Sequence, residues 1–198
     1  MPTEVQQPAE LPGIPQSAPD PHQRLEEKRL RDAIVEEAKT WLGTPYHPCA
    51  DVKGAGVDCG MLLVRVYCDL GLIERFDPRP YPSQWALHQR AELYLELVKR
   101  FGRELPEGEA PKRGDAALFK FGHCWAHGAI ITDWPNLIHA NPSMNPNAPC
   151  REDNWLQNTE LHKRPPRFFS CFPQYFIRER AKHSAELKYA NLLKEITA

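Results

Sequence analysis

The chain has 198 residues, which is the length of one domain with extensions. Its 25 lysines and arginines against 26 aspartates and glutamates give a formal net charge of −1, which does not indicate the basic surface of a nucleic-acid-binding protein. No apolar run approaches the ~20 residues of a transmembrane helix, so we expect neither nucleic-acid binding nor membrane insertion.

The N-terminal segment is rich in proline. Residues 1–26 hold six of the 20 prolines and lack both the basic and the apolar region of a secretory signal peptide. We therefore predict a disordered tail and no signal peptide. Apolar residues then recur at helical spacing over residues 24–42, before Gly43, so a first helix is predicted there.

A loop leads to the second predicted helix. The segment HPCADVKGAGVD has two glycines and no periodicity, which indicates a loop that ends at Asp58. Beyond it an apolar face runs along residues 59–71 and ends at Gly71, so Cys59 opens a helix whose N-cap is Asp58. A third helix is predicted over residues 83–101.

The hydrophobic period changes in the second half of the chain. Short apolar segments separated by turn residues predict an antiparallel meander, with strands at residues 116–121, 127–133 and 137–140. A mostly polar, irregular stretch follows at 141–166, and 167–172 predicts a further strand. Helices first and strands later indicate an α+β fold with the sheet packed on the Cys59 helix. The predicted domain spans residues 27–175 and precedes an amphipathic helix at 176–198.

Cys59 is the first candidate for chemistry. Six cysteines are too few for a disulfide scaffold, in which cysteine exceeds roughly 8–10% of residues, so we expect free thiols. Backbone N–H groups at a helix start favour an anion, so we expect the Cys59 thiolate to be stabilised there, as a nucleophile requires. The alternative is a small buried side chain without reactivity. A nucleophile also needs a base, and a group that orients that base.

Two histidines in the predicted strands are candidates for base and orienter. His127 starts one strand and His139 lies in the next. A hairpin centred on Asp133 would place them opposite each other on one face, whereas a slip of one residue would place them on opposite faces. A structural role for each histidine is the alternative. Together with Cys59 they form a candidate Cys-His-His triad.

These residues stand in a longer pattern. The segment GTPYHPCADVKGAGVDCGMLLVRVY, followed by KRGDAALF, HGAIITD and LIHA, resembles the NlpC family of papain-like cysteine peptidases, which cut bacterial cell-wall peptides. The resemblance covers residues 30–141 and implies the papain-like NlpC fold. It implies Cys59 as nucleophile, His127 as general base and then acid, and His139 as the residue that orients the imidazole. It also implies that Tyr46 lies beside the nucleophile and helps to bind substrate or the oxyanion.

The resemblance implies a substrate as well. The expected reaction is hydrolysis, through a thioester and without a cofactor, of the bond between D-Glu and meso-diaminopimelate in peptidoglycan stem peptides; amidase and acyl-transferase activities remain open. Many family members have a serine after the nucleophile, which with the preceding aspartate holds the free amine of a wall peptide. Here Asp58 is kept but Gly60 replaces the serine, so a preference for a free N-terminal L-Ala is not implied.

The block GTPYHPCADVKGAGVDCG looks most like the branch of the family encoded with the tail genes of phages and prophages. This resemblance implies synthesis in the bacterial cytoplasm without a signal peptide and, by analogy, association with a tail that acts at the cell wall. The expected partners are therefore peptidoglycan stem peptides and phage tail proteins, and the C-terminal helix is a candidate docking element.

Two other classes of function remain open. The first is a zinc site, because the loop and the strand region contain side chains of the type that binds zinc, namely His47, Cys49, Cys59, His123, Cys124 and His127. No close Cys-x-x-Cys pair is present among them. The second is a non-catalytic tail component that keeps the fold for assembly or for binding wall peptides. An intact Cys59, His127 and His139 favours the enzyme over this component.

Overall fold

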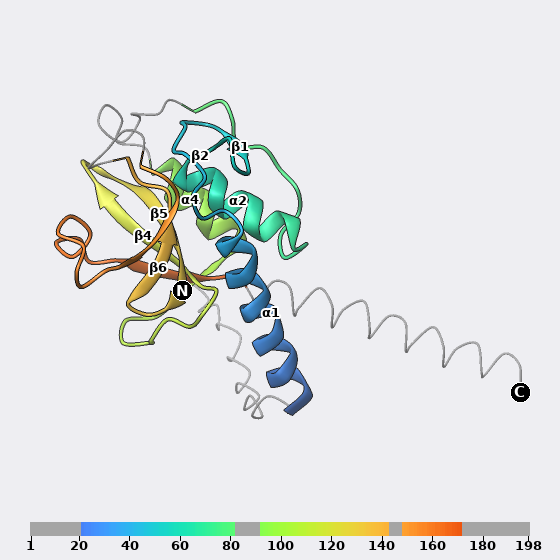
Figure 1. The fold of residues 1–198 in the computed structure, drawn as a ribbon. Helices are drawn as coiled ribbons and strands as arrows, with labels where there is room; N and C mark the ends of the chain where they lie inside the picture. Colours follow the sequence, from blue (N-terminus) through green and yellow to red (C-terminus); the bar gives the residue numbers. More distant parts are fainter. Residues whose placement is uncertain (1–20, 82–91, 143–147, 172–198) are drawn as a thin grey trace, which may run out of the picture.

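The computed structural model describes residues 21–81, 92–142 and 148–171 (Figure 1). Within these ranges no helix is both long and apolar enough to cross a membrane. Three predicted segments lie outside the described residues, namely residues 1–20 of the predicted tail, the first part of the predicted third helix and the helix predicted at 176–198.

Helix α1 (Pro21–Lys39) begins inside the segment predicted to be a tail, so the boundary placed at residue 26 is wrong. Proline fits the first turn of a helix because the N–H that it lacks would have no intrahelical partner there. Ion pairs four residues apart, Glu27 with Arg31 and Lys28 with Asp32, stabilise the turns that follow.

Helix α2 (Cys59–Asp69) confirms the predicted second helix. Asp58 is its N-cap and accepts a hydrogen bond from the Met61 N–H at 2.8 Å. Gly71 follows the C-cap with a φ of +69°, a left-handed conformation that glycine adopts without strain. Helix α4 (Leu93–Phe101) corresponds to the end of the predicted third helix.

The sheet confirms the predicted meander and adds strands that were not predicted. Its order is β3-β8-β4-β5-β6-β7, and all neighbouring strands are antiparallel. The strands are β3 (Arg103–Glu104), β4 (Ala116–Phe121), β5 (Cys124–Asp133), β6 (Asn136–His139), β7 (Arg151–Asn154) and β8 (Arg167–Ser170). Strand β7 lies in the stretch 141–166 that was predicted to be irregular, so that prediction is wrong for residues 151–154. Its residues, REDN, are all polar and give no strand signal.

The loop before α2 also contains structure that the sequence did not predict. Strands β1 (Asp51–Val52) and β2 (Gly56–Val57) form a short antiparallel hairpin. This hairpin brings the loop against the start of α2, where an isolated bridge pairs Tyr46 with Val57.

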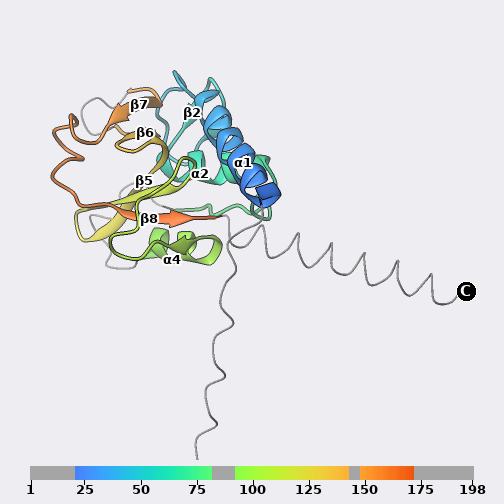
Figure 2. The ribbon, with the colours of Figure 1, turned by 90° about the horizontal axis from the view of Figure 1, so that it is seen from below.

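The helices cover one face of the sheet. Figures 1 and 2 show α1 and α2 side by side against the strands. Side chains from α1, α2 and α4 form one core cluster with alternate residues of the sheet, among them Ala116, Leu118, Ile130 and Ile138. The intervening residues form a second cluster on the other face, with Leu161, Trp134, Trp155 and Phe168. The alternation follows from the two-residue period of a strand.

Candidate active site

Cys59 lines a cavity at the start of α2. It is the first residue of α2, its thiol is free and its side chain is half-buried. The cavity has a volume of about 280 Å³. Four residues expected at the site line it, namely Tyr46, Asp58, Cys59 and Gly60. The structure therefore brings the predicted nucleophile and the predicted substrate-binding residues together.

The Cys59 thiol donates a hydrogen bond to the carbonyl of Ala126, the residue before His127, at 3.8 Å. Burial raises the pKa of this thiol to about 12, and the neighbouring Asp58 carboxylate adds to the rise. Backbone N–H groups of Gly128, Cys59 and Gly60 lower the pKa, but by less. The N–H groups at the helix start thus favour the thiolate in the predicted direction, but desolvation outweighs them.

A β-bulge places Ala126 beside the thiol. Strand β5 pairs His127 with Phe119 and Trp125 with Lys120, which leaves Ala126 without a partner residue on β4. Such a bulge inserts one extra residue and bends the strand, and bulges are frequent next to active sites. As a result, the Ala126 carbonyl, one residue before His127, faces the thiol of Cys59. No local sequence signal predicted this bulge.

His127 and His139 are joined directly. His127 Nε2 lies 2.9 Å from His139 Nδ1, and the two side chains are 5% and 0% exposed. The predicted register was nevertheless wrong, because Ile130 pairs with Ile138 and the turn lies at Trp134 and Pro135 instead of Asp133. The difference is two residues, which keeps both histidines on one face of the sheet.

Burial disfavours the charged form of both imidazoles. Burial lowers the pKa of His127 well below its usual value, and the neighbouring His139, Arg151 and Arg164 lower it further. Burial also lowers the pKa of His139. The contact with His139 uses His127 Nε2, so Nδ1 is the ring nitrogen that this contact leaves for exchanging a proton.

Asp153 is a candidate functional residue that sequence reasoning missed. Its Oδ2 lies 3.5 Å from His139 Nε2, on the side of that imidazole away from His127. The same carboxylate accepts a hydrogen bond from Asn158 Nδ2 at 2.6 Å and pairs with Arg151 at 3.4 Å. Interactions with His139 and Asn158 lower the pKa of Asp153, so the carboxylate is charged. The sequence signal was absent because β7 has no hydrophobic alternation.

The predicted substrate-binding residues form a dense polar network at the start of α2. Asp58 is 4% exposed and accepts hydrogen bonds from the N–H of Met61, the N–H of Cys49 and the hydroxyl of Tyr81. Tyr46 is half-buried, and desolvation raises the pKa of its hydroxyl, which stays protonated. Tyr81 was not predicted, since it lies in an aperiodic segment.

Tyr94 is a further side chain at the site that the sequence did not indicate. Its hydroxyl donates to the Cys59 carbonyl at 3.3 Å and lies over Gly128. A Cβ atom at Gly128 would overlap that hydroxyl, so only glycine leaves room for it. Gly128, which follows His127 in β5, is therefore required by its close packing against Tyr94.

The described residues contain no group of three or more histidine, cysteine or acidic side chains that could hold a metal ion. The zinc hypothesis grouped His47 and Cys49 of the loop with Cys124, whose side chain is buried at the start of β5. These side chains do not converge on one point in the described part of the chain.

Comparisons with known proteins give structural matches. No family model matches the chain, and no curated protein matches its sequence. NlpC1 from Trichomonas vaginalis matches with a TM-score of 0.50 and 15% identity, over 70% of this chain and 42% of that chain. The peptidoglycan hydrolase RipB from Mycobacterium tuberculosis matches with a TM-score of 0.49 and 17% identity, over 80% of this chain and 74% of that chain.

A third match has no catalytic activity. RipD from Mycobacterium tuberculosis is described as a non-catalytic NlpC/p60 domain protein adapted to peptidoglycan binding. It matches with a TM-score of 0.44 and 12% identity, over 71% of this chain and 96% of that chain. The chain spans less than half the length of NlpC1, and at 15% identity that likeness concerns the fold alone. The described domain thus has the α+β fold of NlpC/p60 domains, as predicted.

Proposed function

We propose that this protein is a cysteine peptidase that hydrolyses amide bonds in peptidoglycan stem peptides. The observation that carries the proposal is the position of Cys59, at a helix start in a cavity and against strand β5, whose His127 pairs with His139 of β6. A buried, paired imidazole one residue from a thiol's hydrogen-bond acceptor is an arrangement that packing alone does not require. The fold shared with NlpC/p60 domains supports the choice of substrate.

The proposed reaction starts from a neutral thiol and a neutral imidazole. When substrate enters, His127 Nδ1 takes the proton of Cys59 Sγ, and the sulfur attacks the carbonyl carbon of the scissile amide. Backbone N–H groups at the start of α2 and the Tyr46 hydroxyl are the donors for the oxyanion. His127 then gives its proton to the leaving amine, and water cleaves the thioester.

His139 and Asp153 have positioning roles in this proposal. His139 Nδ1 holds His127 Nε2 at 2.9 Å, which fixes the ring so that Nδ1 is directed away from His139. The Asp153 carboxylate favours positive charge on the imidazole pair, because it raises the pKa of His139 against the effect of burial. The pair is thereby better able to carry the proton taken from the thiol.

The bond we propose is that between D-Glu and meso-diaminopimelate in the stem peptide. The test is digestion of purified peptidoglycan followed by mass spectrometry of the soluble products. We expect wild-type protein to release fragments cut at that bond and the Cys59→Ala variant to release none. A Cys68→Ala variant is the matched control, because Cys68 is a free thiol on the same helix that does not line the cavity. Equal release by Cys59→Ala would overturn the proposal.

A specific observation favours a second candidate, a domain that binds wall peptides without cutting them. The hydrogen bond of the Cys59 thiol goes to the Ala126 carbonyl and not to an imidazole. The test is whether the purified protein sediments with insoluble peptidoglycan. Sedimentation without release of soluble fragments by any purified preparation would support this candidate over the enzyme.

We also propose that the protein acts at the cell wall as a component of a phage or prophage tail, as the sequence resemblance implies. The measurement is mass spectrometry of purified tail particles from a host that carries the gene. Detection of the chain in the particles would support this location, and its exclusive recovery from particle-free fractions would contradict it.

A further inference from the structure

Cys49, in the loop before α2, has a left-handed backbone conformation that a cysteine rarely adopts. Its φ is +58°, and among the residues that the structure describes it is the only non-glycine with a positive φ. Such a conformation persists only where the surrounding structure holds it, and residues of this kind are frequent at functional sites. The contacts that hold Cys49 therefore bear on the neighbouring site at Cys59.

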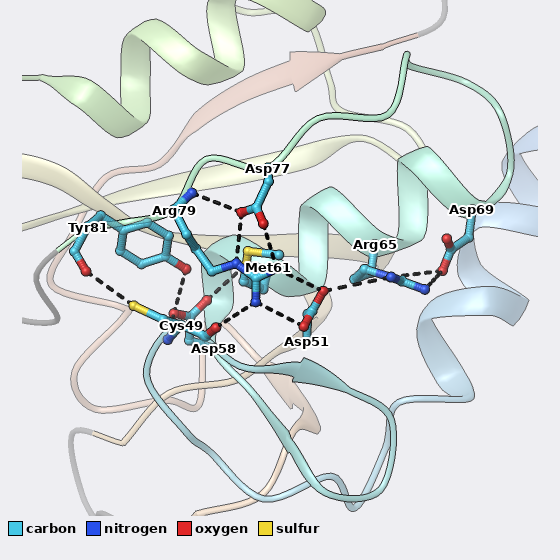
Figure 3. Close-up of polar contacts among 9 residues, drawn as sticks. All are labelled: Cys49, Asp51, Asp58, Met61, Arg65, Asp69, Asp77, Arg79 and Tyr81. Atoms are coloured by element: carbon cyan, nitrogen blue, oxygen red, sulfur yellow. Dashed lines mark hydrogen bonds and ion pairs between the residues drawn. The ribbon is translucent and has the colours of Figure 1, made fainter.

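Three polar groups of Cys49 are each held by a different residue (Figure 3). Its N–H donates to Oδ2 of Asp58, the N-cap of α2, at 2.7 Å. Its carbonyl accepts a hydrogen bond from Arg79 Nη1 at 3.1 Å, and its thiol donates to the Tyr81 carbonyl at 3.1 Å. Cys49 thus joins the start of α2 to residues 77–81, which we call the strap.

Arg79 anchors the strap to the loop. Besides the Cys49 carbonyl, its guanidinium contacts Asp51 of β1 at 3.0 Å and both carboxylate oxygens of Asp77, at 2.7 and 2.8 Å (Figure 3). The planar fork of a guanidinium serves several acceptors at once, which a single ammonium does not. Without Arg79, the carboxylates of Asp51 and Asp77 would be left close together as like charges, which repel. The loop and the strap therefore depend on Arg79 at this point.

The strap forms one wall of the cavity beside Cys59. Pro78, Pro80 and Tyr81 line the cavity, whereas Arg79 between them does not. Helices α2 and α4 supply most of the other lining residues. A ligand in the cavity therefore contacts a surface that Arg79 holds in place without touching the ligand itself.

We propose that Arg79 is a positioning residue for the proposed hydrolysis, and that it fixes the wall against which the stem peptide binds beside Cys59. The inference rests on the proposed function and deepens it. Because Arg79 acts through its contacts with Cys49, Asp51 and Asp77, its loss should weaken peptide binding and leave the chemical step nearly unchanged. A substitution that only unfolded part of the protein would lower the apparent kcat and leave KM as it was.

The test is Arg79→Gln, measured with the peptide L-Ala-γ-D-Glu-meso-diaminopimelate. Calorimetry on a Cys59→Ala background gives the dissociation constant without turnover, and KM and kcat are measured with Cys59 intact. We expect Arg79→Gln to raise the dissociation constant and KM by about tenfold and to keep kcat within about twofold. Unchanged affinity and KM in Arg79→Gln, with or without a lower kcat, or no binding of the peptide by Cys59→Ala, would overturn the inference.

The matched control is Arg65→Gln. Arg65 pairs with the same Asp51 at 3.7 Å and with Asp69 at 2.9 Å, but it lies on α2 and does not line the cavity (Figure 3). We expect wild-type affinity, KM and kcat in this variant. An equal loss of affinity in Arg65→Gln and Arg79→Gln would mean that surface charge in general, and not the anchor of the strap, determines binding.

Arg79→Lys separates the shape of the side chain from its charge. Lysine keeps the positive charge, but its ammonium cannot reproduce the fork that serves the Cys49 carbonyl and the two carboxylates together. We expect Arg79→Lys to recover at most part of the affinity that Arg79→Gln loses. Full wild-type affinity would show that a charge alone suffices and would contradict the role given to the guanidinium.

Cys49 reports on the strap without any need for activity. Its thiol is bonded to the Tyr81 carbonyl, so release of the strap should expose it to iodoacetamide. We expect severalfold faster labelling of Cys49 in Arg79→Gln than in wild-type protein, as followed by peptide mass spectrometry, with no change at Cys150 in the core. Equal acceleration at both thiols would indicate general unfolding, and no acceleration would indicate a strap that does not need Arg79; either result would contradict the inference.

The two proposals fail in different ways in this design. If Arg79→Gln weakens peptide binding and exposes Cys49, but wild-type protein cuts neither the peptide nor peptidoglycan, the proposed function is wrong and the role of Arg79 in the cavity wall stands. If wild-type protein cuts peptidoglycan but Arg79→Gln keeps wild-type affinity and KM, the proposed function stands and the inference is wrong.

Discussion

His139 Nε2 lies 3.5 Å from Asp153 Oδ2, across the paired strands β6 and β7. This separation is long for a hydrogen bond. It is short enough for an ion pair, which forms when the imidazole pair gains a proton. The chain thus places a thiol, two imidazoles and a carboxylate in sequence from α2 to the edge strand β7.

Asp153→Asn should lower kcat by about tenfold or more with little change in KM, because Asp153 supports the imidazole pair and does not line the cavity. The carboxylate raises the pKa of His139, so its removal should also move the acidic limb of the kcat profile to lower pH. Steady-state kinetics between pH 5 and 9 measures both effects. A purely structural role would lower activity without moving the limb.

The control for this variant is Glu152→Gln on the same strand. Glu152 is the adjacent carboxylate of β7, it is exposed, and it accepts a hydrogen bond from Thr132. We expect its kcat and its pH profile to match those of the wild type. An equal shift in both variants would mean that general electrostatics, and not the contact with His139, determines the profile.

The pH dependence of Cys59 alkylation tests the protonation state of the resting site. Burial raises the pKa of the thiol to about 12, so the thiolate fraction grows about tenfold per pH unit up to that value. Iodoacetamide should therefore modify Cys59 slowly at pH 7 and steadily faster through pH 9 and 10, as followed by peptide mass spectrometry. A rate that is already constant below pH 8 would show a preformed thiolate and contradict this state.

The sequence was sufficient for those parts of the site that depend on local patterns. Asp58 and Cys59 open α2 as predicted because an N-cap and a helical apolar face are encoded in consecutive residues. The strands carrying His127 and His139 were predicted from runs of apolar residues, and the fold class followed from the order of the elements. The prediction that His127 and His139 lie on one face of the sheet was correct, although the predicted register of the hairpin was not.

The remaining parts depend on contacts between distant segments. Asp153 lies in an edge strand of four polar residues, where pairing with β6 and not hydrophobic alternation determines the structure. The bulge at Ala126 adds one residue to β5 and has no signature of its own. Tyr81 reaches Asp58 from an aperiodic segment 23 residues further along the chain. None of these positions can be found by reading neighbouring residues.

Acid should destabilise the protein through its two buried histidines. Both folded-state pKa values lie below the ordinary value of 6.5, so below pH 6.5 the unfolded chain binds protons that the native state does not. The free energy of unfolding should then fall by up to about 1.4 kcal/mol per pH unit for each histidine, before carboxylates titrate near pH 5. Urea denaturation at pH 5.5, 6.5 and 7.5 measures this slope.

The matched variants for this slope are His127→Gln and His47→Gln. His127 is buried, whereas His47 is exposed, so only the first substitution should flatten the dependence between pH 6.5 and 5.5. If His127→Gln retains the full wild-type slope, the histidine is not the group that is held neutral in the native state.

Two glycines near Cys59 should respond differently to alanine. A Cβ at Gly128 would overlap the Tyr94 hydroxyl and lie 3.1 Å from Leu63, so Gly128→Ala should destabilise the fold by about 1–3 kcal/mol. A Cβ at Gly60 meets only ordinary contacts, at 3.5 Å or more, so Gly60→Ala should retain wild-type stability or gain slightly in the helix.

Because Tyr94 also holds the Cys59 carbonyl, Gly128→Ala should lose peptidoglycan hydrolysis out of proportion to its unfolded fraction. Thermal unfolding and hydrolysis rates measured on both variants at one temperature check this, and wild-type hydrolysis by folded Gly128→Ala would mean that the contact between Tyr94 and Cys59 has no part in the reaction.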